Sequence, residues 1–133
     1  MEEDPAAPYV RRAVEWLKTC QREDGGWGED GATYWKERRS KVKASTASQT
    51  AWAVLGLLAA GEVKSDEVKR GVAYLLNAPR NGAKWQEEWY TAVGFPRVFY
   101  LRYHGYSTYF PVWALTRYRN LVNGNVPPTR SGM

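Results

Sequence analysis

A short sequence pattern near the start of this chain is repeated 58 residues later. Residues 12–17 read RAVEWL, and residues 70–75 read RGVAYL. The same offset carries Trp27 onto Trp85, and five identities keep register without a gap over sixteen positions. A repeat of this length is typical of folds built from stacked helical units, in which each copy covers the apolar face of its neighbour.

Each copy opens with an amphipathic helix. In the first, Val10, Val14 and Leu17 follow helical spacing, and Pro8 suits the first turn of the helix. The same spacing of apolar residues recurs from Val68 to Leu76. A single apolar stripe predicts helices that bury one face and expose the other.

The helices that follow are of a second kind. Residues 51–60 read AWAVLGLLAA, an apolar run that comes after Ser45 or Thr46 as the N-cap. A helix with no polar face is expected to be buried on every side. The last helix, predicted over about 109–120, begins with a similar face rich in aromatic rings, and Trp113-Ala114 repeats Trp52-Ala53.

Half-exposed outer helices therefore alternate with buried inner helices, which predicts an all-α fold that is part of an (α/α)6 toroid. About six helix pairs close such a ring, and this chain supplies about two. We expect an acidic leader over residues 1–9, a barrel segment over 10–122 and a flexible tail over 123–133. Within the barrel segment the two repeats lie near 10–61 and 66–121.

Charge and cysteine content exclude several classes of function. The net charge is +5, with one basic cluster over residues 36–43 that can be a solvated loop or a contact with anionic lipid. No basic helix face interleaved with rings is evident, so nucleic-acid binding is not expected. Cys20 is the only cysteine, which rules out an internal disulfide. We expect no signal peptide, because residues 1–5 include no apolar segment, and no membrane-spanning helix, because the longest apolar run is half of a bilayer span of about 20 residues.

A glutamine, a glycine-rich turn and a tryptophan follow the first outer helix. The Gln21 amide can bond the free N–H groups of a neighbouring helix end while its flat face lies on the Trp27 indole. The alternative is an ordinary helix end with a packed tryptophan. In the second copy a proline replaces the glutamine and a lysine replaces the second glycine, so we expect Trp85 to be held less firmly.

Aromatic residues gather in the last third of the chain. Nine of the 23 residues from 88 to 110 are aromatic, and most are tyrosines. Such a set is most often a core, but each buried tyrosine hydroxyl needs a partner. Rings that face an apolar cavity can stabilise a carbocation by up to ~2 kcal/mol each without offering a nucleophile.

Together these segments resemble the squalene–hopene cyclase and oxidosqualene cyclase family. The glutamine–glycine–tryptophan loop is similar to the family's QW motif. Further similar segments are DGGWGED at 24–30, STASQTAWA at 45–53, and 94–106 with the following FPVWAL at 110–115. The resemblance runs from about Val10 to Leu121 and is closest to the bacterial squalene–hopene branch.

The resemblance implies a chemistry. The family folds squalene in a dry central cavity, protonates a terminal double bond and guides the cyclising cations past aromatic walls, without cofactor or metal. Five residues fall on the family's cavity-lining positions: Phe95, Phe99, Leu101, Tyr103 and Tyr106. Phe95 and Phe99 would stabilise later cations, Tyr103 and Tyr106 would place rings near the early cyclisation, and Leu101 would shape the wall.

The same resemblance gives a smaller number of expected site residues in the first repeat. Trp27 and Tyr34 fall near positions that face the acid end of the cavity. Gln21, Trp27 and Trp85 would be the structural residues of the QW motifs. For every cavity residue the alternative is packing within the barrel.

The proton donor of the family is absent from this chain. It belongs to an Asp-x-Asp-Asp motif, whereas the four aspartates here, at 4, 24, 30 and 66, are never spaced that way. His104 has no serine, cysteine or aspartate partner at nucleophile spacing. One histidine and one cysteine cannot form a zinc site. We therefore expect no catalytic residue in the chain.

Two functions remain open. The first is the carboxyl-terminal part of a squalene–hopene-type cyclase, which would be inactive alone. Together with the rest of the barrel it would isomerise squalene to hopene-like pentacycles. The cyclase would be a peripheral protein on the cytoplasmic side of the bacterial inner membrane. The second is a non-catalytic α/α repeat module that binds an apolar lipid or a partner protein. In both, exposed apolar surface predicts association, with the remaining barrel or as a homodimer.

Overall fold

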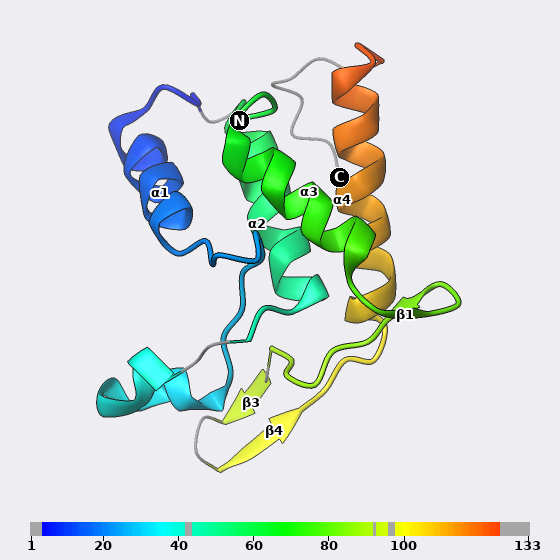
Figure 1. Ribbon diagram of the computed structural model, residues 1–133. Helices are drawn as coiled ribbons and strands as arrows, with labels where there is room; N and C mark the ends of the chain where they lie inside the picture. The colour runs from blue at the N-terminus through cyan, green and yellow to red at the C-terminus, as the bar shows by residue number, and fades with distance from the viewer. Residues whose placement is uncertain (1–3, 42–43, 92, 96–97, 126–133) are drawn as a thin grey trace.

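The computed structural model describes residues 4–41, 44–91, 93–95 and 98–125, and these are mostly helical. Figure 1 shows the arrangement. The α-helices are α1 (Pro8–Thr19), α2 (Ala47–Ala59), α3 (Asp66–Asn77) and α4 (Tyr106–Val122). Two 3₁₀ helices, Gly31–Tyr34 and Lys36–Lys41, lie between α1 and α2. The strands form two antiparallel hairpins, β1 (Arg80–Asn81) with β2 (Lys84–Trp85) and β3 (Val93–Phe95) with β4 (Phe99–Leu101).

α2 lies in the centre, and α1, α3 and α4 pack around it (Figure 1). α2 and α4 make the most extensive contact between elements, and α3 packs across α2 and touches α4. α1 lies against the other side of α2 (Figure 1). The chain therefore contains the two outer and inner helix pairs that the repeat predicts. Among the described residues, no helix combines the length and apolar character that crossing a membrane requires.

Helix starts follow from local side-chain chemistry. Of the two candidate caps for α2, Thr46 is the N-cap, and its hydroxyl accepts a hydrogen bond from the Gln49 backbone N–H. Ser65 caps α3 in the same way, and Pro8 occupies the first turn of α1. α4 begins at Tyr106, three residues before the predicted start.

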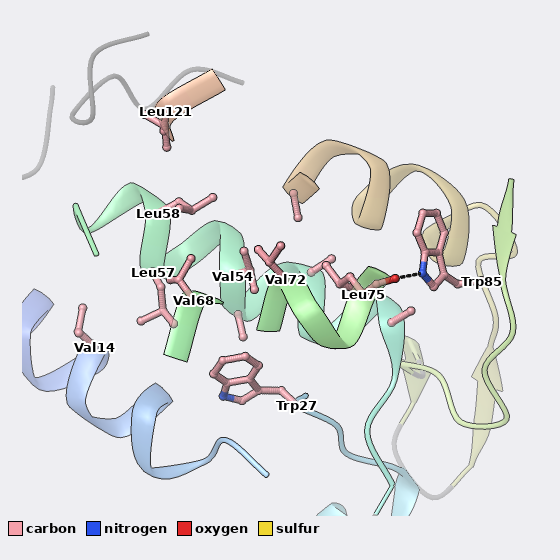
Figure 2. Packing of buried hydrophobic residues seen from close by; sticks show 14 residues of the cluster. Val14, Trp27, Val54, Leu57, Leu58, Val68, Val72, Leu75, Trp85 and Leu121 are labelled. Carbon is pink, nitrogen blue, oxygen red and sulfur yellow. Dashed lines mark hydrogen bonds between the residues drawn. The ribbon is translucent and has the colours of Figure 1, made fainter. Parts of the chain in front are cut away.

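The core lies between α2 and α3 and is shown in Figure 2. Val54, Leu57 and Leu58 of α2 meet Val68 and Leu75 of α3, and all five are fully buried. α1 contributes one fully buried residue, while the rest of its apolar stripe is half-buried. Burial of each such side chain is worth roughly 1.5–3 kcal/mol relative to exposure, so these five residues contribute much of the stability of the α2–α3 contact.

The inner helices are less enclosed than their composition predicts. In α2, Gly56 and Ala59 are exposed and Trp52 is half-buried. In α4, Tyr109 is 50% and Trp113 38% exposed. The prediction that α2 is buried on every side is therefore wrong for this chain, because α1, α3 and α4 cover only part of its circumference.

A close approach of backbone and ring fixes how the two repeats meet. A Cβ added at Gly71 of α3 would lie 2.7 Å from Val54 Cγ2 and 2.9 Å from Trp27 Cζ3. At Gly56, also within a helix, the nearest atom is Leu17 Cδ1 at 3.7 Å. The hydrogen side chain of Gly71 is thus what allows the Trp27 ring to rest on α3.

This difference predicts opposite effects of one substitution. Gly71→Ala should lower the free energy of unfolding by about 1–3 kcal/mol through overpacking. Gly56→Ala should leave it unchanged or raise it by up to about 1 kcal/mol, because alanine is the better helix former. Urea unfolding followed by tryptophan fluorescence measures both. Equal effects of the two substitutions would contradict the close packing at Gly71.

An ion cluster ties α1 to the loop between α2 and α3. Glu62 accepts hydrogen bonds from Arg11 Nη1 at 2.7 Å and lies 2.9 Å from Lys18 Nζ. The hydrogen bond from Lys18 lowers the pKa of Glu62 below its ordinary value of 4.5, and Arg11 adds to this effect. The stabilisation from this carboxylate is therefore present above pH 4.5 and is lost as the pH falls through the lowered pKa.

Glu62→Gln should make the stability of the chain less sensitive to acid. The free energy of unfolding of the unmodified chain should fall more steeply than that of the variant between about pH 5 and pH 3. Glu88→Gln, at an exposed position, is the matched control and should keep the original slope. Parallel curves for Glu62→Gln and the unmodified chain would show that the ion cluster does not stabilise α1.

Candidate functional site

The two tryptophans of the repeat are held in the same way. Trp27 Nε1 donates a hydrogen bond of 2.8 Å to the backbone oxygen of Leu17, and Trp85 Nε1 donates one of 2.8 Å to that of Leu75 (Figure 2 draws the second). Both rings are buried, Trp85 at 3% exposure. The expectation that Trp85 is held less firmly is wrong, because the indole bonds to the last turn of its own outer helix and Arg80 also stacks on its ring.

The Gln21 amide acts as a donor. Its Nε2 donates to the backbone oxygens of Gly25 and Glu67, each at 2.9 Å, and so links the turn to the first turn of α3. We expected the amide to bond free N–H groups at a helix end, and the structure corrects this, because its nitrogen donates to two backbone carbonyls instead. Gln21 Oε1 is buried and accepts no hydrogen bond from the described residues.

Buried polar side chains at the start of α2 clamp the loop that follows Trp27. Thr50 Oγ1 accepts from the Trp27 backbone N–H at 2.9 Å, and the Trp27 oxygen accepts from the Thr46 N–H at 2.9 Å. Gln49 brackets Glu29, accepting from its N–H and donating to its oxygen. Sequence reasoning matched this segment to a family but missed its role, although three polar residues opening an apolar helix were a usable signal.

An open groove of about 840 Å³ runs between α1, α2 and this loop. Trp27 and Tyr34, both expected near a cavity, line it. Trp16, Leu17, Trp52 and Ala53 complete most of its apolar surface. Polar or small lining comes from Cys20, Arg22, Gly28, Glu29, Thr33, Gln49 and Thr91.

The other five expected cavity residues lie elsewhere, on the β3–β4 hairpin and the start of α4. Phe95 and Phe99 meet edge to face at 5.3 Å across the hairpin and are 65% and 45% exposed. Leu101, at the end of β4, is also exposed. Tyr103 stacks on Tyr106 at 5.1 Å.

Trp52 connects the groove with the second group of rings. It lines the groove and meets Tyr106 edge to face at 5.4 Å and Phe110 at 5.1 Å. Phe110 in turn stacks on Trp113 at 6.1 Å. A second link is Tyr34, which stacks on Tyr100 of the hairpin at 6.1 Å. Neither Trp52 nor Phe110 was among the expected site residues, although the repeated Trp-Ala pair pointed to the former.

The aspartates serve local structure. Asp24 Oδ1 accepts from the Gly26 N–H and the Ser45 hydroxyl, and Asp30 Oδ1 accepts from the Ala32 N–H. Asp4 bonds the Ala6 N–H, and Asp66 pairs with Lys69. No cluster of metal-ligating side chains occurs within the described part of the chain. The site is a surface of rings rather than a set of acids and bases.

Paired inner and outer helices with tryptophan-held turns, and a wall of rings beside them, define a segment of an α/α toroid with an aromatic inner surface. The model of the squalene–hopene cyclase C-terminal domain family matches residues 1–120. The chain belongs to this family, which has the α/α toroid fold, so the predicted fold class is confirmed.

The curated relatives are enzymes of this family and much longer than the chain. The probable squalene–hopene cyclase of Sinorhizobium fredii is 59% identical over 124 residues, which cover 92% of this chain and 19% of that protein. The squalene–hopene cyclase of Bradyrhizobium diazoefficiens is 54% identical, covering 95% and 19%. That of Zymomonas mobilis is 53% identical, covering 93% and 19%. The chain thus spans about a fifth of their length.

The contacts of Trp52 predict a large effect of its removal. Trp52→Ala should lower the free energy of unfolding by about 2–3 kcal/mol, because it deletes a half-buried ring of α2 that packs on Tyr106 and Phe110 of α4. Trp16→Ala, at a position 64% exposed, should change it by no more than about 0.5 kcal/mol. Thermal and urea unfolding measure both, and equal destabilisation would show that the Trp52 contacts do not hold the helices together.

Proposed function

We propose that the chain forms one wall of the cavity in which a squalene–hopene-type cyclase cyclises squalene. The observation that carries the proposal is a set of partly exposed rings in two contacting groups. Trp52 meets Tyr106, which stacks on Tyr103, and Phe95 meets Phe99 on the hairpin. A ring contributes to catalysis of this kind only if one face is open to the substrate. Family membership supports squalene or a similar triterpene as the molecule that fills the open side.

The rings act on the cations that arise during cyclisation. Phe95 and Phe99 stabilise the later cations through their negative faces, by up to ~2 kcal/mol per desolvated ring. Tyr103 and Tyr106 place rings near the early cyclisation, and Leu101 shapes the wall. None of these side chains offers a nucleophile strong enough to trap the cation, so the cyclisation continues.

Trp27 and Tyr34 belong to the end of the cavity near the acid. Both line the groove beside α2, and Trp52 joins this groove to the other rings. The acid itself, an Asp-x-Asp-Asp motif, comes from another part of the cyclase, since the aspartates of this chain cap turns and helices. The chain alone therefore binds apolar ligands weakly and cyclises nothing, and it needs no cofactor.

The open faces of α2 and α4 are covered by the rest of the cyclase barrel. Gly56, Ala59 and Trp113 would then lie in a protein interior, as their apolar character requires. The basic charge of segment 36–43 attracts the peripheral cyclase to anionic lipid at the cytoplasmic side of the bacterial inner membrane. Residues 42–43 lie outside the described residues. A homodimer of the whole cyclase is compatible with this arrangement.

A segment exchange tests the proposal. The aligned 124 residues of the Sinorhizobium fredii relative are replaced by this chain, and the purified hybrid is incubated with squalene. We expect hopene, detected by gas chromatography with mass spectrometry, and none from the chain alone. Phe95→Leu and Phe99→Leu should each lower the rate by up to roughly 30-fold, the equivalent of one cation–π contact.

Val98→Ala, in the same hairpin and 78% exposed, is the control and should leave the rate unchanged. A folded hybrid that forms no hopene would contradict the cavity role and favour the non-catalytic module that binds an apolar lipid or a partner. Hopene formed by the chain alone would refute the assignment of the proton donor to another part of the cyclase.

A further inference from the structure

The β3–β4 hairpin has little structure of its own. Each strand has three residues, and the side chains of Phe95, Phe99 and Leu101 are exposed. An isolated two-stranded hairpin of this size is at best marginally stable in water. In Figure 1 it extends away from the α-helices, so its position depends on the segments that enter and leave it and on the stacking of Tyr100 on Tyr34.

The segment that enters the hairpin is attached to α2 by Glu87. Its Oε2 accepts from the Ser48 backbone N–H at 3.0 Å, and its Oε1 accepts from the Ser48 hydroxyl at 3.0 Å. Ser48 is 1% exposed and lies in the first turn of α2. A carboxylate at this place satisfies a free N–H of the helix and interacts favourably with the helix dipole.

Two further contacts complete the attachment. Gln49 Nε2 donates to Thr91 Oγ1 at 3.0 Å, just before β3. Arg102, just after β4, donates from Nη2 to the Glu87 backbone oxygen at 3.1 Å, and its guanidinium lies 4.8 Å from the centre of the Tyr90 ring. Both ends of the hairpin are thus joined to each other and to the start of α2.

We propose that Glu87 is a positioning residue, which sets where the hairpin presents Phe95 and Phe99 relative to the ring of Trp52. The inference rests on the proposed cavity function. Ser48 and Trp52 are one helical turn apart, so the anchor of the hairpin and the first ring of the wall lie on the same side of α2. One rigid helix thereby fixes the distance between the two groups of rings.

The test uses the hybrid cyclase described above and compares Glu87→Ala with Glu88→Ala, its exposed neighbour of the same chemistry. Glu87→Ala should raise the ratio of incompletely cyclised to pentacyclic products by roughly tenfold, since a displacement of about 1 Å can cost up to about 100-fold in rate. Deuterium uptake of residues 93–101 should rise, while that of α2 stays unchanged. Glu87→Gln, which keeps one acceptor for Ser48, should lie between the two.

Each result bears on the proposal. Equal products and equal deuterium uptake for Glu87→Ala and Glu88→Ala would overturn it, and so would a lower rate with an unchanged product ratio. If Glu87→Ala does not fold, Ser48→Ala and Glu87→Gln replace it, because each removes only one hydrogen bond. Both should then raise the ratio of incompletely cyclised to pentacyclic products, and an unchanged ratio would overturn the proposal. If the unmodified hybrid is folded but inactive, the cavity function fails, and deuterium uptake still decides whether Glu87 holds the hairpin.

Discussion

The buried indole of Trp27 is the contact on which the two repeats depend. Its N–H bonds to the end of α1, its ring lies against Gly71 of α3, and its backbone is bonded by Thr46 and Thr50 of α2. One residue therefore joins three helices through these hydrogen bonds and one ring contact. Each buried polar group of this residue has a partner, and the loss of one would leave a carbonyl or an N–H group unsatisfied inside the protein.

The beginning of α2 organises the site in a similar way. Its first turns bond the loop after Trp27 through Gln49 and the root of the hairpin through Ser48, and one turn further on it carries Trp52. Polar bonds thus hold two irregular segments, while the rings that these segments carry remain half-exposed. This division suits a cavity wall, which needs rings without polar neighbours and yet must hold them in place.

Much of the fold could be predicted from the sequence. The repeat indicated two outer and two inner helices, and the apolar spacing located α1 and α3. Pro8 marked one helix start, and Ser45 or Thr46 marked another, of which the structure selects Thr46. The candidate site was predicted less completely. The expected cavity residues lie in two groups, Trp27 with Tyr34 and the set from Phe95 to Tyr106. Trp52, which lines the groove with the first group and contacts the second, was missed because the spacing of residues along one helix does not show which residues of other elements contact it.

By itself the sequence determined the helix periods, the repeat and the absence of an Asp-x-Asp-Asp motif, because each of these is given by residue types and their spacing along the chain. Only the tertiary structure decided that Gln21 donates to carbonyls, that the Trp85 indole bonds to its outer helix in the same way as that of Trp27, and that one side of α2 stays open. These depend on which atoms from distant segments meet. A hydrogen bond needs a donor and an acceptor, and a buried face needs a second face packed on it. Here the two partners come from distant segments, so only the fold of the whole chain decides which of them meet.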